Sequence, residues 1–294
     1  MKKEKKYYAF RANIAFENLN LFNFKEEDNK VNRNLLFREF FKDLKEEKLK
    51  SIYVRREYIL LYICEENDLV HCKLARKRNV SINNIDGFEL KERIEEDYPY
   101  VNVFIELKHQ KILIENNTSV FDNVITAKKE IEKIMSSNFY IKNAIIKLNP
   151  IVKQNEFEEH IKKYDSIYSI KFKLSVPNWL DGESSAEDFL TDVRNVTFGD
   201  SVDLTIKNST GNLVLNNPSI NSFVRYSSSG AGTWEMVCKN NNEKRTTIKS
   251  GDLNESVMII LDLDMEENKI LVHQLESINC AFNKVEEIEK FKED

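Results

Sequence analysis

The segment from Pro99 to Ser136 constrains the fold of this chain more than any other part of it. Apolar residues alternate along 101–107 and again along 112–114, and a short polar break at His109-Gln110 separates the two runs. Alternation with a period of two is typical of half-buried strands, so the two runs predict a hairpin. An apolar pattern of helical spacing then begins at Ser119, with Asp122 three residues later, and predicts a packed helix.

Similar patterns recur along the rest of the chain. They predict strands near 8–16, 50–55, 57–64, 68–75, 140–148, 170–176, 202–206, 234–237 and 246–249. They predict helices near 32–47, 157–164 and 275–288. Hairpins therefore alternate with single helices, which favours an α+β fold with mixed or antiparallel sheets and helices packed on them.

Four further expectations concern less regular segments. We expect a short helix over 88–94 and a strand at 257–263 that pairs with 270–272. A helix capped by Ser184 and Glu187 is expected to bury Phe189, Leu190, Val193 and Val196. Residues 208–232 are expected to be the least regular stretch.

The length of 294 residues is long for one domain and comfortable for two. The turn signal at Asn149-Pro150 predicts a boundary there, with one α+β domain at 1–150 and a second at 151–294. The two parts differ in charge. Residues 1–80 hold 19 Lys and Arg against 13 Asp and Glu, or +6, and the remaining residues hold 25 against 36, or −11. An excess of positive charge in the first part of a chain indicates a surface that binds a polyanion, although charge also varies between the faces of any protein.

Targeting signals and cysteine usage point to the cytoplasm. The basic N-terminus leads into a segment interrupted by Arg11 and Asn13, which is unlike a signal peptide, and no apolar run is long enough for membrane insertion. The four cysteines are scattered without a C-x-x-C pair. We expect reduced thiols, with Cys64 and Cys72 on neighbouring strands.

No strong catalytic, metal or nucleotide motif is present, and no cofactor is expected. The four histidines (His71, His109, His160 and His273) share no local metal-ligand spacing, so structural or surface roles are the first interpretation. The sequence leaves one alternative open: a catalytic histidine paired with a nucleophile that is distant in sequence but close in space.

Two segments give weaker hints of chemistry. Asp262 and Asp264 would lie on one side of a strand end, where two carboxylates can hold a divalent cation, as in metal-dependent nucleases. A polar hairpin turn explains the same residues. The run Ser227–Thr233 is small and rich in hydrogen-bond donors, and would suit a phosphate. It lacks the Gly-Lys-Ser/Thr ending of a P-loop, so a mobile surface loop is the favoured interpretation.

Basic side chains give the best candidate site. Arg55 and Arg56 lie beside tyrosines, and Lys73, Arg76, Lys77 and Arg78 end a predicted strand. Long cations on one face contact phosphates, and aromatic neighbours stack on exposed bases. A solvated basic turn explains the same residues. Lys171 and Lys173, on the outward side of their strand, would extend the basic surface from the second half.

The last helix carries apolar residues at 275, 278, 282 and 285, close to a heptad seam. Docking on its own domain is the favoured use of this face. Dimerisation through it is the alternative.

The order of elements in the first 150 residues resembles a known family. The resemblance rests on the opening strand Tyr8-Ala9-Phe10-Arg11, a helix rich in Leu and Phe, the strand at 58–63 with its hairpin partner, and the hairpin and helix after Pro99. This pattern resembles the RexA-like phage exclusion proteins and related bacterial proteins from phage-defence loci. The resemblance implies a cytoplasmic, dimeric, DNA-binding sensor of an anti-phage system. It carries over no individual functional residue.

The leading hypothesis is therefore a nucleic-acid-binding sensor or adaptor of a bacterial anti-phage defence system, not itself catalytic. Its expected partners are the DNA or RNA backbone, a second copy of the chain, and a second defence protein encoded nearby. The alternatives are a metal-dependent nuclease that uses Asp262 and Asp264, a nucleotide-binding module that uses 227–233, and a protein-interaction scaffold.

Overall fold

A computed structural model of the protein describes residues 4–16, 33–46, 49–53, 56–86, 89–139, 144–153, 155–176, 185–197, 199–241, 243–250, 256–261 and 272–289. The first half of the chain forms β1 (Lys5–Phe16), α1 (Arg33–Glu46), β2 (Leu49–Tyr53), β3 (Arg56–Glu66), β4 (Leu69–Arg76), β5 (Arg78–Asp86), β6 (Glu89–Asp97), β7 (Tyr100–Glu106), β8 (Lys111–Glu115), α2 (Val124–Phe139) and β9 (Ala144–Pro150). The second half forms α3 (Asn155–Lys163), β10 (Ser166–Ser175), α4 (Ser185–Thr197), β11 (Ser201–Lys207), α5 (Pro218–Tyr226), the turn η3 (Ser227–Ala231), β12 (Gly232–Lys239), β13 (Thr246–Lys249), β14 (Met258–Leu261) and α6 (Val272–Glu289).

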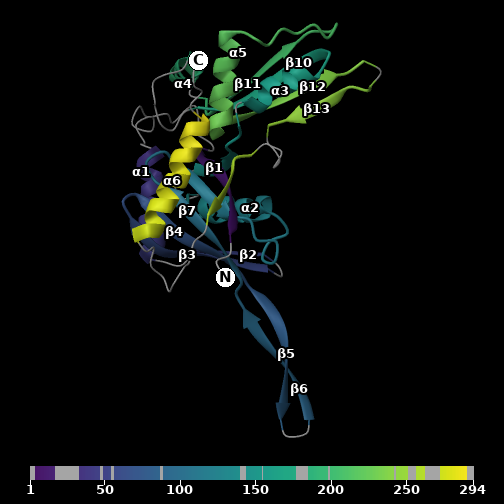
Figure 1. The fold of residues 1–294 in the computed structure, drawn as a ribbon. Helices are drawn as coiled ribbons and strands as arrows, with labels where there is room; N and C mark the ends of the chain where they lie inside the picture. Colours follow the sequence, from purple (N-terminus) through teal and green to yellow (C-terminus); the bar gives the residue numbers. More distant parts are fainter. Residues whose placement is uncertain are drawn as a thin grey trace.

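The fold is α+β, as the sequence predicts. Every pairing between these strands is antiparallel. The strands form one large sheet, one sheet of four strands and one separate hairpin, and the helices pack singly against the two sheets (Figure 1).

The large sheet has the strand order β14-β1-β8-β7-β4-β3-β2, with β9 pairing with the second half of β1. Alternation gives it two apolar faces. One face packs against α1 and α2 through residues such as Phe10, Val103 and Ile105. The other face packs against α6 through residues such as Phe104 and Leu113. The hairpin after Pro99, formed by β7 and β8, lies in the middle of this strand order. Both of its faces are covered by helices.

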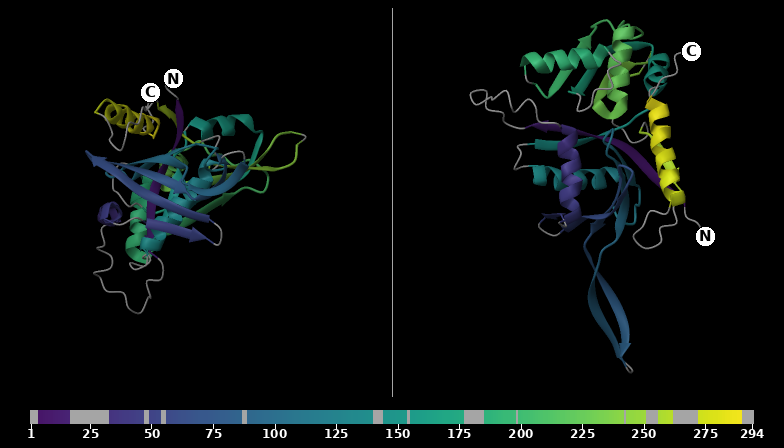
Figure 2. Two further views of the ribbon diagram at one scale, coloured as in Figure 1. Left: turned by 90° about the horizontal axis from the view of Figure 1, so that it is seen from below. Right: turned by 90° about the vertical axis from the view of Figure 1, so that its left-hand side faces the viewer.

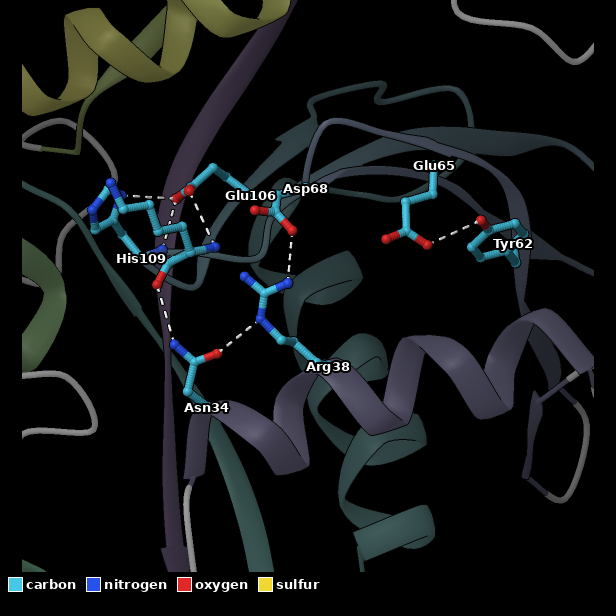
Figure 3. Close-up of polar contacts among 8 residues, drawn as sticks. Asn34, Arg38, Tyr62, Glu65, Asp68, Glu106 and His109 are labelled. Carbon is cyan, nitrogen blue, oxygen red and sulfur yellow. Dashed lines mark hydrogen bonds and ion pairs between the residues drawn. The ribbon is translucent and has the colours of Figure 1, made fainter.

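Side chains of helix α1 form hydrogen bonds with two turns of this sheet (Figure 3). Arg38 donates to Asp68, in the turn between β3 and β4, at 2.6 Å, and also to Asn34 on its own helix at 3.2 Å. Asn34 in turn donates to the carbonyl of Lys108, in the turn between β7 and β8, at 3.3 Å. These contacts set the position of the helix at one end of the sheet.

The four-stranded sheet has the order β11-β10-β12-β13 and forms the second lobe. Its core lies on one side only, where α3, α4 and α5 contribute Phe157, Leu190 and Ile220. Trp234 of β12 is buried there, and its ring meets that of Phe157 edge to face at 5.2 Å. The opposite side of the sheet is turned to solvent.

Strands β5 and β6 form a hairpin that stands away from both sheets; we call it the arm (Figures 1 and 2). Nine residue pairs join its strands in an unbroken register, from Arg78 with Asp97 to Asp86 with Glu89. The sequence prediction of a helix over 88–94 is wrong. Leu90 and Ile94 have helical spacing, but their segment pairs with β5 instead, and both side chains stay about 70% exposed.

The region after Asn208 is more regular than the sequence predicts. Asn217 caps α5 by accepting a hydrogen bond from the backbone nitrogen of Ile220 at 3.0 Å, and Pro218 occupies the first turn. The turn η3 follows directly. Ser227 and Ser228 are buried, so the prediction of a mobile surface loop at this run is also wrong.

The turn η3 joins the two lobes. Asn13 of β1 donates to the carbonyl of Gly230 at 2.8 Å, and the backbone nitrogen of Val152 donates to the carbonyl of Ser228 at 3.0 Å. Near it, Arg33 of α1 forms an ion pair of 2.6 Å with Asp200, which precedes β11. Burial and the nearby Arg194 lower the pKa of Arg33, and Asp200 opposes this shift.

The C-terminal part of the chain returns to the first lobe. Strand β14 pairs with β1, and α6 packs on the large sheet. The last helix therefore docks within the chain, but on the sheet of the first lobe and not on its own domain at 151–294 as expected. The expected pairing of 257–263 with 270–272 falls largely outside the described residues, which end at Leu261 and resume at Val272, where α6 begins. A single boundary near Pro150 therefore does not separate the two lobes, and independent folding of 1–150 and 151–294 stays a prediction.

Two helices differ in detail from their prediction. Helix α2 begins at Val124 and not at Ser119, since Asn123 accepts from the backbone nitrogen of Thr126 at 3.0 Å. Helix α4 buries Leu190 as expected, but Phe189 and Val196 are 42% and 80% exposed. The expected cap Ser184 lies outside the described residues. No helix within the described ranges is long and apolar enough to cross a membrane.

Candidate nucleic-acid interface

The solvent side of the four-stranded sheet carries a concentration of lysines, which we call the lysine face. Pairing registers place Lys207 of β11 and Val237 of β12 opposite Ser169 of β10, and place Lys249 of β13 opposite Glu235 of β12. Because residues two apart on a strand share a face, five lysines lie on this side. They are Lys171, Lys173, Lys207, Lys239 and Lys249.

Only two carboxylates in the described strands of the lysine face, Asp203 and Glu235, oppose these lysines. Lys171 pairs with Asp203 at 2.6 Å, and Lys173 pairs with Glu235 at 3.1 Å. Lys249 is also within 3.8 Å of Glu235. The hydrogen bond from Lys173, with the charges of Lys249 and Lys171, lowers the pKa of Glu235. The face therefore keeps an excess of positive charge after its internal pairs are formed.

The excess is greatest at the end of the sheet where β10 begins. In the described part of the chain, no acidic side chain lies within 4 Å of Lys207 or Lys239. Nearby, the guanidinium of Arg245 lies over the ring of Tyr168 at 3.7 Å. Lysines on a flat sheet, spaced about 7 Å apart along a strand, can follow a phosphate backbone.

The basic cluster predicted near the end of β4 is not gathered on one surface. Lys73 and Arg76 point to opposite faces of the large sheet, because they are three residues apart on one strand. The amine of Lys73 lies over the ring of Tyr100 at 4.3 Å, whereas Arg76 donates to the carbonyl of Val120 at 3.2 Å.

The other two members of that cluster brace the root of the arm. Lys77 forms ion pairs with Glu96 and, at 4.0 Å, with Glu57, and the bond to Glu96 raises the pKa of Lys77. Arg78 pairs with Asp97 at 2.7 Å. These cations already have carboxylate partners within the chain.

The remaining predicted residues are placed only in part. Arg56 begins β3, but its side chain is not described, and Arg55, Asp262 and Asp264 lie outside the described residues. Within the described ranges, no three His, Cys, Asp or Glu side chains are grouped as metal ligands would be.

The serine run 227–233 has no geometry for holding a nucleotide. The hydroxyls of Ser227 and Ser229 donate to the carbonyls of Val224 and Tyr226, both at 2.9 Å. The run is also packed between the two lobes, and only Thr233 reaches the solvent side of β12. The hydroxyls of Ser227 and Ser229 therefore serve the fold.

The sequence predicts part of the lysine face. Lys171 and Lys173 point outward, as their alternation predicts. Lys207, Lys239 and Lys249 were missed as site residues, although each continues the outward alternation of its own strand. Only the order of strands in the sheet brings the five together.

Comparison of the chain with protein-family models, with curated proteins and with solved structures finds no match in any of the three.

Proposed function

We propose that this protein binds the phosphate backbone of DNA or RNA through the lysine face. The observation that supports the proposal is the excess of five lysines over two carboxylates on the uncovered side of an otherwise buried sheet. Such contacts carry no sequence information, so the binding is tolerant of sequence and weakens as salt is added.

The resemblance of the first 150 residues to the RexA-like phage exclusion proteins supplies the context of the proposal. In that context the protein is a cytoplasmic sensor or adaptor of an anti-phage defence system. It acts as a homodimer and together with a second defence protein encoded nearby. The exposed aliphatic side chains of the arm support contact with another protein.

Titration of short labelled DNA and RNA oligonucleotides at several salt concentrations tests the proposal. The variant with all five lysines of the lysine face changed to alanine should lose most of its affinity. The slope of log K against log salt should fall by about 4, because each lost phosphate contact removes about 0.7–0.9 from it. An unchanged affinity and slope would contradict the lysine face as the binding site.

The basic cluster at the end of β4 provides a matched control. The variant with Lys73, Arg76, Lys77 and Arg78 changed to alanine removes four cations from the large sheet and the root of the arm, away from the lysine face. It should retain binding, since Lys77 and Arg78 are already paired with carboxylates. If this variant loses more affinity than the lysine-face variant, the binding site is instead the basic cluster that the sequence predicts.

The same assay separates binding from nuclease activity. If magnesium-dependent cleavage is seen and is lost in the double variant Asp262→Asn, Asp264→Asn while binding persists, the metal-dependent nuclease is the better description. If no oligonucleotide binds even at low salt, both nucleic-acid hypotheses fail.

A further inference from the structure

The two strands of the arm differ in charge. Strand β6 has seven charged residues among its nine, from Glu89 to Asp97. Strand β5 has no charged residue over the seven positions from Asn79 to Ile85. Charged side chains on an edge strand are a common means of preventing its pairing with another chain. The edge of β6 is protected in this way, whereas the edge of β5 is not.

The backbone along the outer edge of β5 is also open to another strand. Among the described strands, β5 pairs with β6 alone. The arm extends from the end of the first lobe, away from the second lobe (Figures 1 and 2). Side chains of β5 reach solvent, since Ile82 and Ile85 are 37% and 79% exposed. An extended strand of another chain can therefore add to β5 through main-chain hydrogen bonds.

The sequence of β5 is complementary to itself when two copies of the strand run antiparallel. If Ile82 lies opposite Ile82 of a second copy, each Arg78 lies opposite Asp86 of the other copy. In the same register each Val80 lies opposite Asn84, and no like charges face one another along the strand. Opposite charges directly across two strands stabilise their pairing, and like charges oppose it. The strand therefore fits a second copy of itself about a twofold axis, the commonest symmetry of homodimers.

The charged residues at the two ends of β5 favour the same register. Arg78 pairs with Asp97 of β6 at 2.7 Å, yet 49% of its side chain is exposed and open to a further contact. At the tip of the arm, the register places Asp86 directly opposite Glu89, so two acidic residues stand across from each other. Like charges in such positions destabilise a hairpin. Arg78 of a second copy, opposite Asp86, offsets this repulsion.

We propose that two copies of the chain dimerise by antiparallel pairing of β5 with β5, which joins their arms into one sheet of order β6-β5-β5-β6. The charged β6 strands then form both edges of this joint sheet. Ile85, Leu90 and Ile94 of the two copies lie on the same side of it, because the register pairs odd-numbered residues of β5 with odd-numbered ones. The pairing also stabilises the arm, since independent sheets need three or more strands. It rests on the homodimer of the proposed function, but not on the lysine face.

Sedimentation velocity of the full chain over a range of concentrations tests the proposal. Ile82→Glu places two like charges at the twofold axis, while Arg93, directly opposite within the hairpin, compensates the new carboxylate and preserves the arm. We expect the dissociation constant of the dimer to rise at least about tenfold in this variant. An unchanged dimer in Ile82→Glu, or a wild-type protein that is monomeric at every concentration, would overturn the proposal.

A matched control changes the other strand of the arm. Ile94 lies directly opposite Ser81 and two residues from both Glu92 and Glu96, so Ile94→Lys adds a charge among favourable neighbours. This variant leaves the edge of β5 unchanged and should retain the wild-type dimer. If Ile94→Lys dissociates and Ile82→Glu does not, the two copies pack through the apolar side of their arms, and pairing through the β5 edge is wrong.

Disulfide formation tests the register. Residues directly opposite in an antiparallel pair have Cβ atoms about 4.5–5.5 Å apart, which is near enough for a disulfide after a small movement. With the exposed Cys280 changed to serine, Ile82→Cys should form a disulfide-linked dimer under mild oxidation. Val80→Cys and Asn84→Cys should link to each other in a mixture, but neither should link to itself. Equal linking of all three cysteines to themselves would contradict the pairing.

Oligonucleotide binding separates this proposal from the lysine face. Ile82→Glu changes no residue of that face, so its affinity for a short oligonucleotide should stay within about twofold of the wild-type value. A wild-type protein that binds oligonucleotides but never dimerises contradicts the pairing of β5 alone. A protein that dimerises through β5 but binds no oligonucleotide contradicts the lysine face alone.

Discussion

Three polar residues of the large sheet are buried, although side chains of their types are ordinarily exposed to solvent. His71, Asn102 and Glu115 lie in a sheet that is otherwise packed with aliphatic and aromatic side chains. Buried polar groups persist only when hydrogen bonds compensate for the loss of water. The series His71, Asn102, Glu115 and Lys5 supplies such compensation, ending in an ion pair of 3.1 Å between Glu115 and Lys5.

The burial of His71 predicts sensitivity to acid. Its pKa is about 4 in the fold and 6.5 in the unfolded chain, so between these values only the unfolded chain binds the proton. The free energy of unfolding should therefore fall as pH decreases from about 6.5 to 4, by about 3 kcal/mol. Denaturant titrations over this range measure the slope. The slope should be reduced in His71→Gln, and an equal slope in this variant and the wild-type protein would contradict the assignment.

Gly230 is a second position where one residue type is required. Its φ is +84°, and a Cβ there would lie 2.6 Å from Cβ of Arg11. Gly230→Ala should destabilise the protein by about 2 kcal/mol or more, from backbone strain and from the displaced β1. Gly199→Ala is the control, because its nearest neighbour is a flexible Thr197 hydroxyl at 3.2 Å. Melting temperatures compare the two, and similar values would disprove the close approach.

At the scale of elements, the arm is the exception in a well-packed molecule. Ile85, Leu90 and Ile94 share one of its faces by register and are 79%, 71% and 70% exposed. A two-stranded hairpin is marginal in water by itself. Its root is braced by Arg78 with Asp97 and by Lys77 with Glu96, which holds it out from the body.

Removal of the arm should therefore cost the body little. Replacing residues 79–96 with a short Gly-Ser turn removes no side chain from any of the three hydrophobic clusters. We expect a soluble protein whose melting temperature changes by no more than about 3 °C, since few buried contacts are lost. Thermal unfolding followed by circular dichroism measures this, and a large decrease would show that the arm belongs to the folding unit.

At the scale of the whole molecule, two lobes share a buried polar joint. Arg33 and Asp200 come from different lobes and meet at 2.6 Å, while η3 packs against both β1 and β9. A buried charge that loses its partner costs more than the loss of the pair, because the remaining charge stays out of water.

The ion pair between the lobes predicts an order of stability among variants of Arg33 and Asp200. Asp200→Ala leaves Arg33 buried with its charge less compensated and should destabilise the protein by about 3 kcal/mol. Arg33→Met, Asp200→Ala removes both charges and should recover part of that loss. Calorimetry should show the single variant unfolding in a broader or split transition, as the lobes uncouple. A double variant that is less stable than Asp200→Ala would contradict this account.

The sequence by itself determined the local elements and their faces. Alternation predicts β7, β8 and β10, because the side-chain period of a strand is a local property. Helical spacing likewise predicts α1 and the docking face of α6. The placement of Cys64 and Cys72 on neighbouring strands is also confirmed.

Only the tertiary structure decided how these faces meet. The arm has a helical pattern at Leu90 and Ile94, yet the pairing with β5 determines its structure. The bulge at Ile63 reverses the face of Cys64, and no local pattern signals it. The strand order collects five lysines from four strands, while it separates Lys73 from Arg76. Register and strand order arise from contacts between residues far apart in the chain, so periodicity within one segment cannot specify them.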